Sequence, residues 1–350
     1  MSKTIGAFLF PMVWEAWDRP EATRVFKSLQ DFGVNTIATE SLTYRDDLID
    51  LAHALDMRFV GGISCFSEHG GNHQLLRDRP ELWPILETGE KRPIMEWYIG
   101  VTPTFDDYNQ SRLDEIERIM RDHELDGMCL DFVRWPLHWE LELRPGAPEP
   151  LQSSFDAHTL ARFWEFAGRE QPSQFHTVPD MAQHILTEFH DQWVDFKCKV
   201  VADFVALARE RVKSQHSSAQ IGAYLVAAPD DQRAALVGQR VRDLHAVTDF
   251  LAPMVYHPVL HQRPAWVDAT IDEMVRLAPE KVQPVLQVDS AEGEEMGSDW
   301  GPPVPVEEWR QVACNAAGRQ DILGFVAFTG TALFANNRGQ ILSECLAQNR

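Results

Sequence analysis

One carboxylate, Asp131, stands where catalysis could use it. It ends the apolar run Met128-Cys129-Leu130, which has the composition of a buried strand, and Arg134 and Trp135 follow closely. A carboxylate held rigidly at a strand end could act as nucleophile or base at the anomeric carbon of a sugar. Arg134 could orient it by a charge-assisted hydrogen bond, and Trp135 offers a flat face to a sugar ring. The Asp–Arg pair could instead simply close a loop.

Hydrolysis of a glycosidic bond normally needs a second carboxyl group, ~5–5.5 Å from the first for retention or ~6.5–9.5 Å for inversion. Asp289 and Glu40 are the strongest candidates because each comes at the end of an apolar, strand-like run and would be held rigidly. Either could also be no more than a loop or helix cap. Other acids near predicted strand ends are Glu68, Asp230 and Asp231.

Eight short apolar runs, separated by amphipathic helical patterns, predict the scaffold. They are mostly apolar on both faces, as buried parallel strands are. Eight such units can close into a (β/α)₈ TIM barrel with every helix outside. An open doubly wound sheet is the alternative, but that fold usually has a glycine-rich turn after its first strand, and none occurs here. The predicted strands are 5–12, 34–40, 59–66, 127–132, 221–227, 250–256, 282–288 and 322–328.

Two stretches after predicted strands exceed ordinary loop lengths. Residues 137–192 follow the fourth strand and contain helical patches, and residues 289–306 follow the seventh. Both leave the C-terminal ends of strands, the face on which barrel enzymes build their sites. We therefore expect one barrel domain over residues 1–350, with 137–192 as an inserted helical subdomain over the C-terminal face.

Three motifs carry a resemblance to a known family. Residues 126–136 resemble the signature D-G-x-x-L-D-(Y/F)-(I/V)-R-(Y/F/W)-P of the glycosyl-hydrolase-like TIM barrels of bacterial genomes. Residues 249–256 are similar to the family strand that ends in P-M-V-Y, and residues 282–287 to its x-x-P-x-L-Q strand. The similarity runs in the right order over roughly residues 100–330.

The resemblance implies a glycosidase in which Asp131 is the principal carboxylate and Arg134, Tyr256 and Gln287 line the pocket. The chain departs from the family pattern after the fifth strand, where the acids come several residues later than usual. His257 also stands where the family often has proline. The identity of the second carboxylate therefore stays open.

Further side chains near the strand ends suit a sugar ligand. Trp14 follows the first strand, and an aromatic ring there could bind a sugar face, although a single Trp is more often packing. His257 could bind a sugar hydroxyl or assist acid–base chemistry. Cys65, His69 and His73 have a spacing that superficially suits zinc, but two glycines would break any helix bringing the histidines together. We expect no metal and no other cofactor.

The amino-acid composition limits the kinds of molecule that the protein could bind. The net charge is −21, which disfavours nucleic acid and anionic membranes but does not affect a neutral sugar. No stretch has the ~20 apolar residues that cross a bilayer. The five cysteines are odd in number and without CxxC pairs, which indicates buried thiols in a reducing compartment. We expect a cytoplasmic protein, although an exported chain whose signal peptide has been removed would look the same.

The sequence thus predicts a cofactor-free glycosidase that uses Asp131 and a second carboxyl group on a carbohydrate substrate. One alternative is a metal-dependent hydrolase or isomerase on the same barrel. Another is a sugar-binding barrel without catalysis. The sugar, its anomer, exo or endo action, the stereochemical outcome and the oligomeric state are not determined by the sequence.

Overall fold

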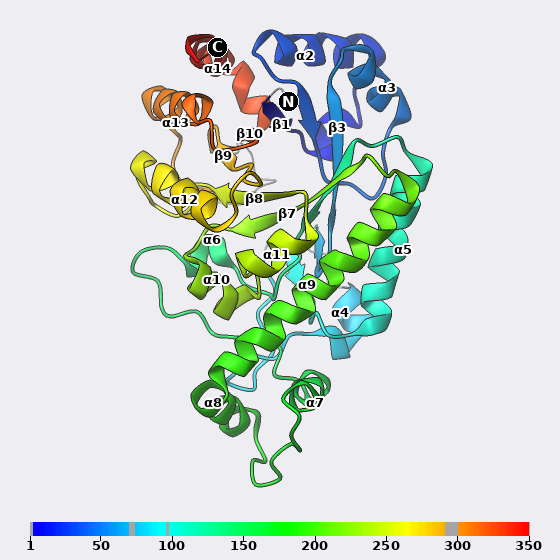
Figure 1. Ribbon diagram of the computed structural model, residues 1–350, viewed down its shortest axis with the longest axis vertical. Helices are drawn as coiled ribbons and strands as arrows, with labels where there is room; N and C mark the ends of the chain where they lie inside the picture. The colour runs from blue at the N-terminus through cyan, green and yellow to red at the C-terminus, as the bar shows by residue number, and fades with distance from the viewer. Residues whose placement is uncertain (1–2, 70–73, 96–97, 291–299, 350) are drawn as a thin grey trace.

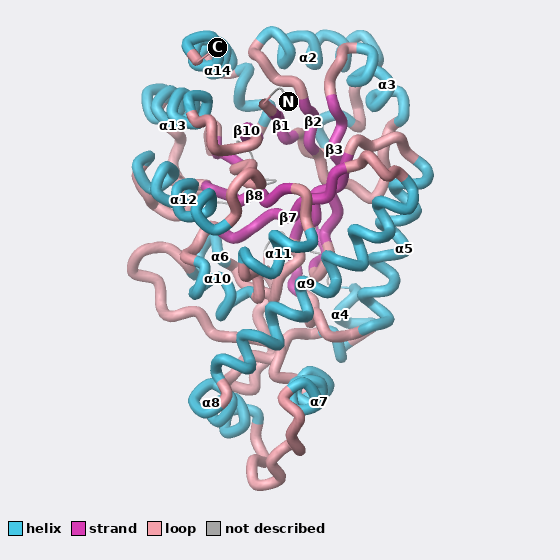
Figure 2. The backbone as a smooth tube through the Cα atoms, viewed as in Figure 1, coloured by secondary structure: helices cyan, strands magenta, loops and turns pink. Residues whose placement is uncertain are grey.

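The centre of the molecule is a closed barrel of parallel strands in the order β1-β10-β9-β8-β7-β6-β3-β2. The computed structural model describes residues 3–69, 74–95, 98–290 and 300–349. Helices surround the strands (Figures 1 and 2), which confirms the (β/α)₈ barrel and excludes the open sheet. The barrel strands are β1 (Thr4–Phe8), β2 (Thr36–Ala38), β3 (Arg58–Ser64), β6 (Gly127–Asp131), β7 (Gln220–Val226), β8 (Phe250–Val255), β9 (Val285–Gln287) and β10 (Gly324–Phe328).

Each barrel strand overlaps one of the eight predicted runs, and most are shorter than the run. The difference arises because apolar residues beyond the strand ends are buried as well: Leu9 follows β1, and Val282 precedes β9 with a single bridge to Leu251. Along β7, Ile221, Ala223 and Leu225 belong to the apolar layer beneath the helices, whereas Tyr224 and Val226 belong to a separate inner cluster. This alternation places the two clusters on opposite faces of the strands.

The outer helices each bury one apolar face. In α2, for example, Asp18 caps the first turn by accepting the Glu21 N–H at 2.8 Å, and Val25, Phe26 and Leu29 are buried. The helices around the barrel are α1 (Pro11–Trp14), α2 (Arg19–Asp31), α3 (Asp46–Ala54), α5 (Asp106–Asp122), α9 (His190–Gln215), α10 (Asp230–Val237), α11 (Val241–Val247), α12 (Pro264–Leu277), α13 (Val306–Gly318) and α14 (Arg338–Gln348).

Two long connections leave the C-terminal ends of β3 and β6. The first contains an antiparallel pair, β4 (Ser67–His69) with β5 (Tyr98–Gly100), as well as α4 (Gln74–Asp78) and a 3₁₀ turn at Pro80–Leu82. The second contains α6 (Trp139–Glu142), α7 (Ala157–Phe166) and α8 (Val178–Glu188). α7 and α8 lie at the lower end of Figure 1. The rings of Phe155 and Phe163 pack on Trp193 of α9, with centroids 4.9 and 5.1 Å from the Trp193 centroid.

The cysteines differ in part from the sequence prediction. Cys65, Cys129 and Cys198 are buried free thiols, as expected. Cys314 and Cys345 instead form a disulfide between α13 and α14, with Cα atoms 4.6 Å apart. The prediction that every cysteine is a free thiol is therefore wrong for this pair. The two cysteines are 31 residues apart in sequence, and the packing of α13 against α14 brings their sulfurs together. The cytoplasmic location stays a prediction.

Gly324 supports the closure of the barrel and gives a test of it. It opens β10 with a φ of +143°, and a Cβ there would lie 1.8 Å from the Thr4 carbonyl oxygen of β1. We expect Gly324→Ala to lower the free energy of unfolding by at least about 2 kcal/mol, because backbone strain and a backbone clash add together. Urea unfolding would measure the loss.

Gly146 is the matched control for this change. Its φ is also positive, +84°, but nothing lies within 4 Å of a Cβ placed there. Gly146→Ala should therefore cost no more than about 1 kcal/mol. Equal small losses in the two variants would contradict the close approach of β10 to β1.

Candidate active site

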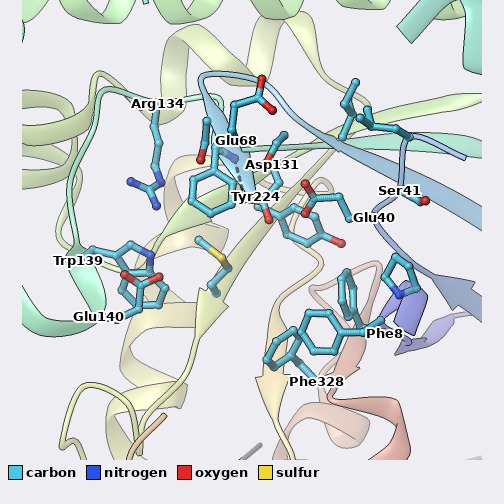
Figure 3. A pocket seen from close by; sticks show the side chains of 18 of the residues that line it. Phe8, Glu40, Ser41, Glu68, Asp131, Arg134, Trp139, Glu140, Tyr224 and Phe328 are labelled. Carbon is cyan, nitrogen blue, oxygen red and sulfur yellow. Dashed lines mark hydrogen bonds between the residues drawn. The ribbon is translucent and has the colours of Figure 1, made fainter. Parts of the chain in front are cut away.

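A cavity of about 450 Å³ opens at the C-terminal ends of the barrel strands (Figure 3). Its walls come from the last residues of the strands and from the segments that follow them, which is where TIM barrel enzymes carry their sites. The lining residues are Phe8, Phe10, Pro11, Met12, Glu40, Ser41, Leu42, Ile63, Ser64, Ser67, Glu68, Arg112, Asp131, Phe132, Arg134, Trp139, Glu140, Tyr224, Met254, Tyr256, Trp300 and Phe328.

Asp131 and Glu40 both line this cavity. Asp131 ends β6 in register with Ser64 of β3, and its Oδ1 accepts the Phe132 N–H at 2.6 Å. Phe132 has a φ of +46°, a left-handed conformation uncommon for a bulky residue, so the chain turns sharply just after the carboxylate. Burial raises the pKa of the neighbouring Tyr224 well above its usual range, and the charges of Asp131 and Glu40 add to the rise. The structure therefore brings these two predicted carboxylates around one hydroxyl group.

Glu140 is a third carboxyl group, which the sequence analysis missed. It lies in α6 beside Trp139 (Figure 3), is 4% exposed, and its Oε2 has no hydrogen-bond partner among the described residues. Burial raises its pKa to about 7, against the opposing positive charge of Arg134. A carboxyl group that keeps its proton near neutral pH is suited to general acid catalysis.

Tyr256 connects Glu140 electrostatically with Asp131. Burial raises the pKa of the Tyr256 hydroxyl well above its usual range, and the charges of Asp131 and then Glu140 contribute to the rise. The charge of Asp131 thus raises the pKa of two tyrosine hydroxyls. Glu40 contributes to the rise at Tyr224, and Glu140 contributes to the rise at Tyr256. In Figure 3, Asp131 is seen between Glu140 and Glu40.

Arg134 lines the cavity as predicted by the family resemblance, but it does not bond to Asp131. Its Nη1 donates to the Leu137 carbonyl oxygen at 2.8 Å, and its guanidinium lies 4.9 Å from the centroid of the Phe132 ring. The expected charge-assisted hydrogen bond to Asp131 is therefore not formed. The positive charge of Arg134 instead favours the ionised form of Glu140, and this opposes part of the rise in the Glu140 pKa caused by burial.

Glu68, a lesser candidate, also lines the cavity but is already neutralised. It lies in β4 and forms an ion pair with Arg112 of α5, another lining residue. Because its carboxylate is already engaged by Arg112, Glu68 is a weaker candidate for the second carboxyl group than Glu40 or Glu140.

Several lining residues have hydrogen-bonding atoms without partners. Leaving a buried donor or acceptor unpaired costs about 1–3 kcal/mol, so a cluster of such atoms indicates a ligand that would satisfy them. Both donors and acceptors occur in the set, which a ligand rich in hydroxyl groups could match. Within the described part of the chain the unpaired atoms are Ser64 Oγ, Arg112 Nε, Arg134 Nε, Trp139 Nε1 and Glu140 Oε2.

Tyr256, the predicted binding aromatic, lies in the cavity wall with two tryptophans. Its ring stacks on Phe328 with centroids 4.8 Å apart and lies 5.9 Å from Trp139 and 5.7 Å from Trp300. Trp139 and Trp300 line the cavity too. These rings give the site apolar surface beside its carboxyl groups.

Two predicted tryptophan ligands lie outside the cavity. Trp135 is fully buried in the core, with its ring centroid 5.8 Å from Trp193 and its Nε1 donating to the Lys197 carbonyl oxygen. Trp14 is buried and donates from Nε1 to Thr39 Oγ1 at 3.0 Å. We correct both to packing residues, because the space that a ligand would fill is occupied by protein atoms.

His257 and Gln287 are also buried outside the cavity lining. Gln287 donates from Nε2 to the Trp300 carbonyl oxygen at 3.0 Å and so supports a residue that does line the cavity. Burial lowers the pKa of His257 to about 4, so the imidazole is uncharged at neutral pH. Its contact with Glu308 at 3.6 Å is therefore not an ion pair at that pH. Neither side chain is placed to touch a ligand in this cavity.

Asp289, which the sequence ranked as a second catalytic carboxylate, organises a loop instead. It is not a lining residue; its Oδ1 accepts the N–H groups of Ser290 and Val304, and its Oδ2 lies 2.5 Å from the buried Arg338. We therefore expect Asp289→Asn to lower the free energy of unfolding by about 3 kcal/mol, because it leaves a buried guanidinium without its counter-charge. Turnover measured at a temperature where the variant is folded should stay within a few-fold of wild type, and a collapse of turnover without loss of stability would return Asp289 to the active site.

Neither a candidate metal site nor a candidate membrane span occurs among the described residues. No group of three or more His, Cys, Asp or Glu side chains is placed there to hold a metal ion. His73 and the side chain of His69 lie outside the described part of the chain. No helix in the described ranges has an apolar stretch that could cross a bilayer.

Comparison with known proteins reveals similarity in structure alone. No family model and no curated protein sequence matches the chain. The glycoside hydrolase domain of PgaB (BpsB) from Bordetella bronchiseptica superposes with a TM-score of 0.66 at 12% identity, covering 98% of each chain. The catalytic domain of β-amylase from Paenibacillus polymyxa gives 0.67 at 10% identity, covering 99% of this chain and 98% of that one. A β-galactosidase from Bacillus circulans gives 0.66 at 9% identity over 99% of this chain and 55% of the enzyme. The protein therefore shares the TIM barrel fold of these glycoside hydrolases.

Proposed function

We propose that the protein is a glycoside hydrolase that uses Asp131 and Glu140 as its pair of carboxyl groups. The observation that carries this proposal is the buried Glu140, with a pKa of about 7, in the same cavity as Asp131. Hydrolysis of a glycosidic bond requires two carboxyl groups in different environments. One donates a proton, and the other acts as a base or nucleophile.

The proposed reaction divides the work between these groups. Glu140 donates its proton to the glycosidic oxygen as the bond to the anomeric carbon breaks, and the alcohol leaves. Asp131 either attacks the anomeric carbon or takes a proton from the water that attacks it, so that water adds across the bond and a free sugar forms. Glu40, which lines the same cavity, would stabilise positive charge developing on the sugar ring.

Two further features support a carbohydrate ligand. The unpaired atoms of Ser64, Arg134 and Trp139 could bind sugar hydroxyl groups. The structural neighbours are glycoside hydrolases, which at this level of identity supports the scaffold and not the choice of sugar.

A panel of nitrophenyl glycosides of both anomeric forms, together with oligosaccharides, tests the proposal. We expect hydrolysis of at least one member by the wild-type protein, resistance of that activity to EDTA, and its loss in Asp131→Asn. Sugars that bind by calorimetry without being hydrolysed would favour a binding protein, and loss of activity with EDTA would favour the metal-dependent alternative. Either result would overturn the mechanism.

A further inference from the structure

Part of the cavity lining consists of apolar side chains. Phe8, Phe10 and Phe328 form a cluster in which the ring centroids are 5.1 to 5.5 Å apart. Met12 and Leu42 line the same cavity. We call these five residues the apolar wall.

The apolar wall faces the polar groups across the barrel. Phe328 ends β10, which is four strands from β6 in either direction around the closed barrel, and Asp131 ends β6. Arg134 and Glu140 follow β6 in the chain. In Figure 3, Phe8 and Phe328 lie below Asp131 and Glu40, whereas Arg134 and Glu140 lie to the left. A molecule that spans the cavity from β6 to β10 would therefore pass from the carboxyl groups of Asp131 and Glu140 to apolar surroundings.

Two residues of the apolar wall are exposed at the surface. Phe8 and Phe328 are buried, whereas Met12 is 53% exposed and Leu42 is 46% exposed. Large apolar side chains this exposed are few in the described part of the chain, and two of them line this one cavity. Exposed apolar side chains that continue a buried apolar surface are typical of a binding site.

The apolar wall offers little to the hydroxyl groups of a sugar. Phenylalanine, leucine and methionine side chains offer no strong donor or acceptor to hydroxyl groups. Phe328 already stacks on Tyr256 and Trp300, with centroids 4.8 and 5.1 Å apart, so much of its ring surface is in contact with other rings. An apolar group would be stabilised there by desolvation alone, without leaving hydrogen bonds unmade.

We propose that the apolar wall binds the leaving group of the substrate, and that this group is an alkyl or aryl chain. The proposal rests on the proposed glycosidase function, in which the glycosidic bond lies beside Asp131 and Glu140 and the departing alcohol extends from there to the apolar wall. The substrate class is accordingly a glycoside of a hydrophobic alcohol, with the chain running from Phe8 and Phe328 out past Met12 and Leu42.

Binding tests the apolar wall without any need for turnover. N-phenyl-1-naphthylamine, an uncharged dye that fluoresces in apolar surroundings, is titrated into the full-length protein and displaced with butanol, hexanol and octanol. We expect affinity for the alcohol to rise about threefold for each added methylene group. Leu42→Ser and Met12→Ser should weaken octanol binding by about threefold or more, and these side chains are exposed enough that folding should be kept.

Leu207 provides the matched control, because it is 47% exposed on α9 and is not a cavity residue. Leu207→Ser should leave octanol binding unchanged. Absence of displaceable dye binding, or equal effects of Leu42→Ser and Leu207→Ser, would overturn the proposal whether or not the protein hydrolyses glycosides.

Turnover separates this proposal from the glycosidase function. The substrates are alkyl glycosides of whichever sugar the nitrophenyl panel identifies. The KM of the wild-type protein should fall from the methyl to the octyl glycoside, and this fall should be smaller in Leu42→Ser. Hydrolysis with a KM independent of chain length would leave the glycosidase standing and remove the hydrophobic leaving-group site. Chain-dependent alcohol binding without hydrolysis of any glycoside would support the apolar wall and remove the glycosidase.

Discussion

Asp131→Asn should lower turnover by ~10³-fold or more while the melting temperature stays constant or rises. Asparagine keeps the size of the side chain and an Oδ1 that can accept the Phe132 N–H, but it has no negative charge. If Asp131 attacks the anomeric carbon, or stabilises positive charge there, most of the rate depends on that charge. Stability should not depend on it, because removing a carboxylate from a cavity that also holds Glu40 relieves repulsion.

Asp126, at the other end of β6, provides the control. Its Oδ2 accepts the Phe59 N–H at 2.7 Å and lies 3.0 Å from His53 Nε2, far from the cavity lining. Asp126→Asn should therefore lower the melting temperature and spare turnover. Thermal unfolding and steady-state kinetics on the best glycoside distinguish the two variants. An Asp131→Asn protein that unfolds earlier yet keeps near-normal turnover would remove Asp131 from the site.

Glu140→Gln should have a large effect that depends on the leaving group. A general acid contributes about 10²–10⁴-fold, but chiefly for alcohols that leave poorly without a proton. Hydrolysis of alkyl glycosides should fall by that factor, whereas dinitrophenyl glycosides, whose leaving group needs no proton, should react at close to the wild-type rate. The wild-type kcat/KM should decline as the pH rises through about 7, where Glu140 loses its proton, and the variant should lack this decline. An unchanged alkaline decline, or equal losses on all substrates, would show that Glu140 is not the acid.

Stability supplies a second measurement on the same variant. The pKa of Glu140 is raised from 4.5 to about 7 in the folded protein, so between these values the native state holds more protons than the unfolded state. Stability is therefore lost as the pH rises, and above the folded pKa the buried charge costs on the order of 3 kcal/mol. Glu140→Gln should be more stable than wild type by up to this amount at about pH 8 and by much less at about pH 5. Glu149, which is exposed, gives the control, and Glu149→Gln should not alter this pH dependence in urea unfolding.

The sequence by itself was sufficient to predict the barrel and to place Asp131 at the end of one of its strands. Alternation of buried apolar strands with amphipathic helices is a local pattern, and eight repeats of it fit a closed barrel. Because parallel barrel strands all end on one face, an acid at the end of such a strand is placed at the site by the same local pattern. This is why Asp131 and Glu40 were found, and why both line the cavity.

Tertiary structure decided which of the residues that follow the strands face the cavity. Trp135 and Trp139 are four residues apart and similar in sequence context, yet one is buried against α9 and the other lines the cavity. Asp289 ends a strand-like run as Asp131 does, but Arg338 packs beside it and makes it part of a loop. Neither outcome follows from a local pattern, because each depends on a partner far along the chain.

Glu140 shows the physical reason most clearly. It comes from a short helix in a long connection, and nothing in its neighbours marks it as different from an exposed glutamate. Its pKa rises because the folded chain removes water from around it, and desolvation is a property of the completed packing. The sequence thus determined the barrel and the carboxylates at its strand ends, whereas the tertiary structure alone decided which acid would hold a proton near neutral pH.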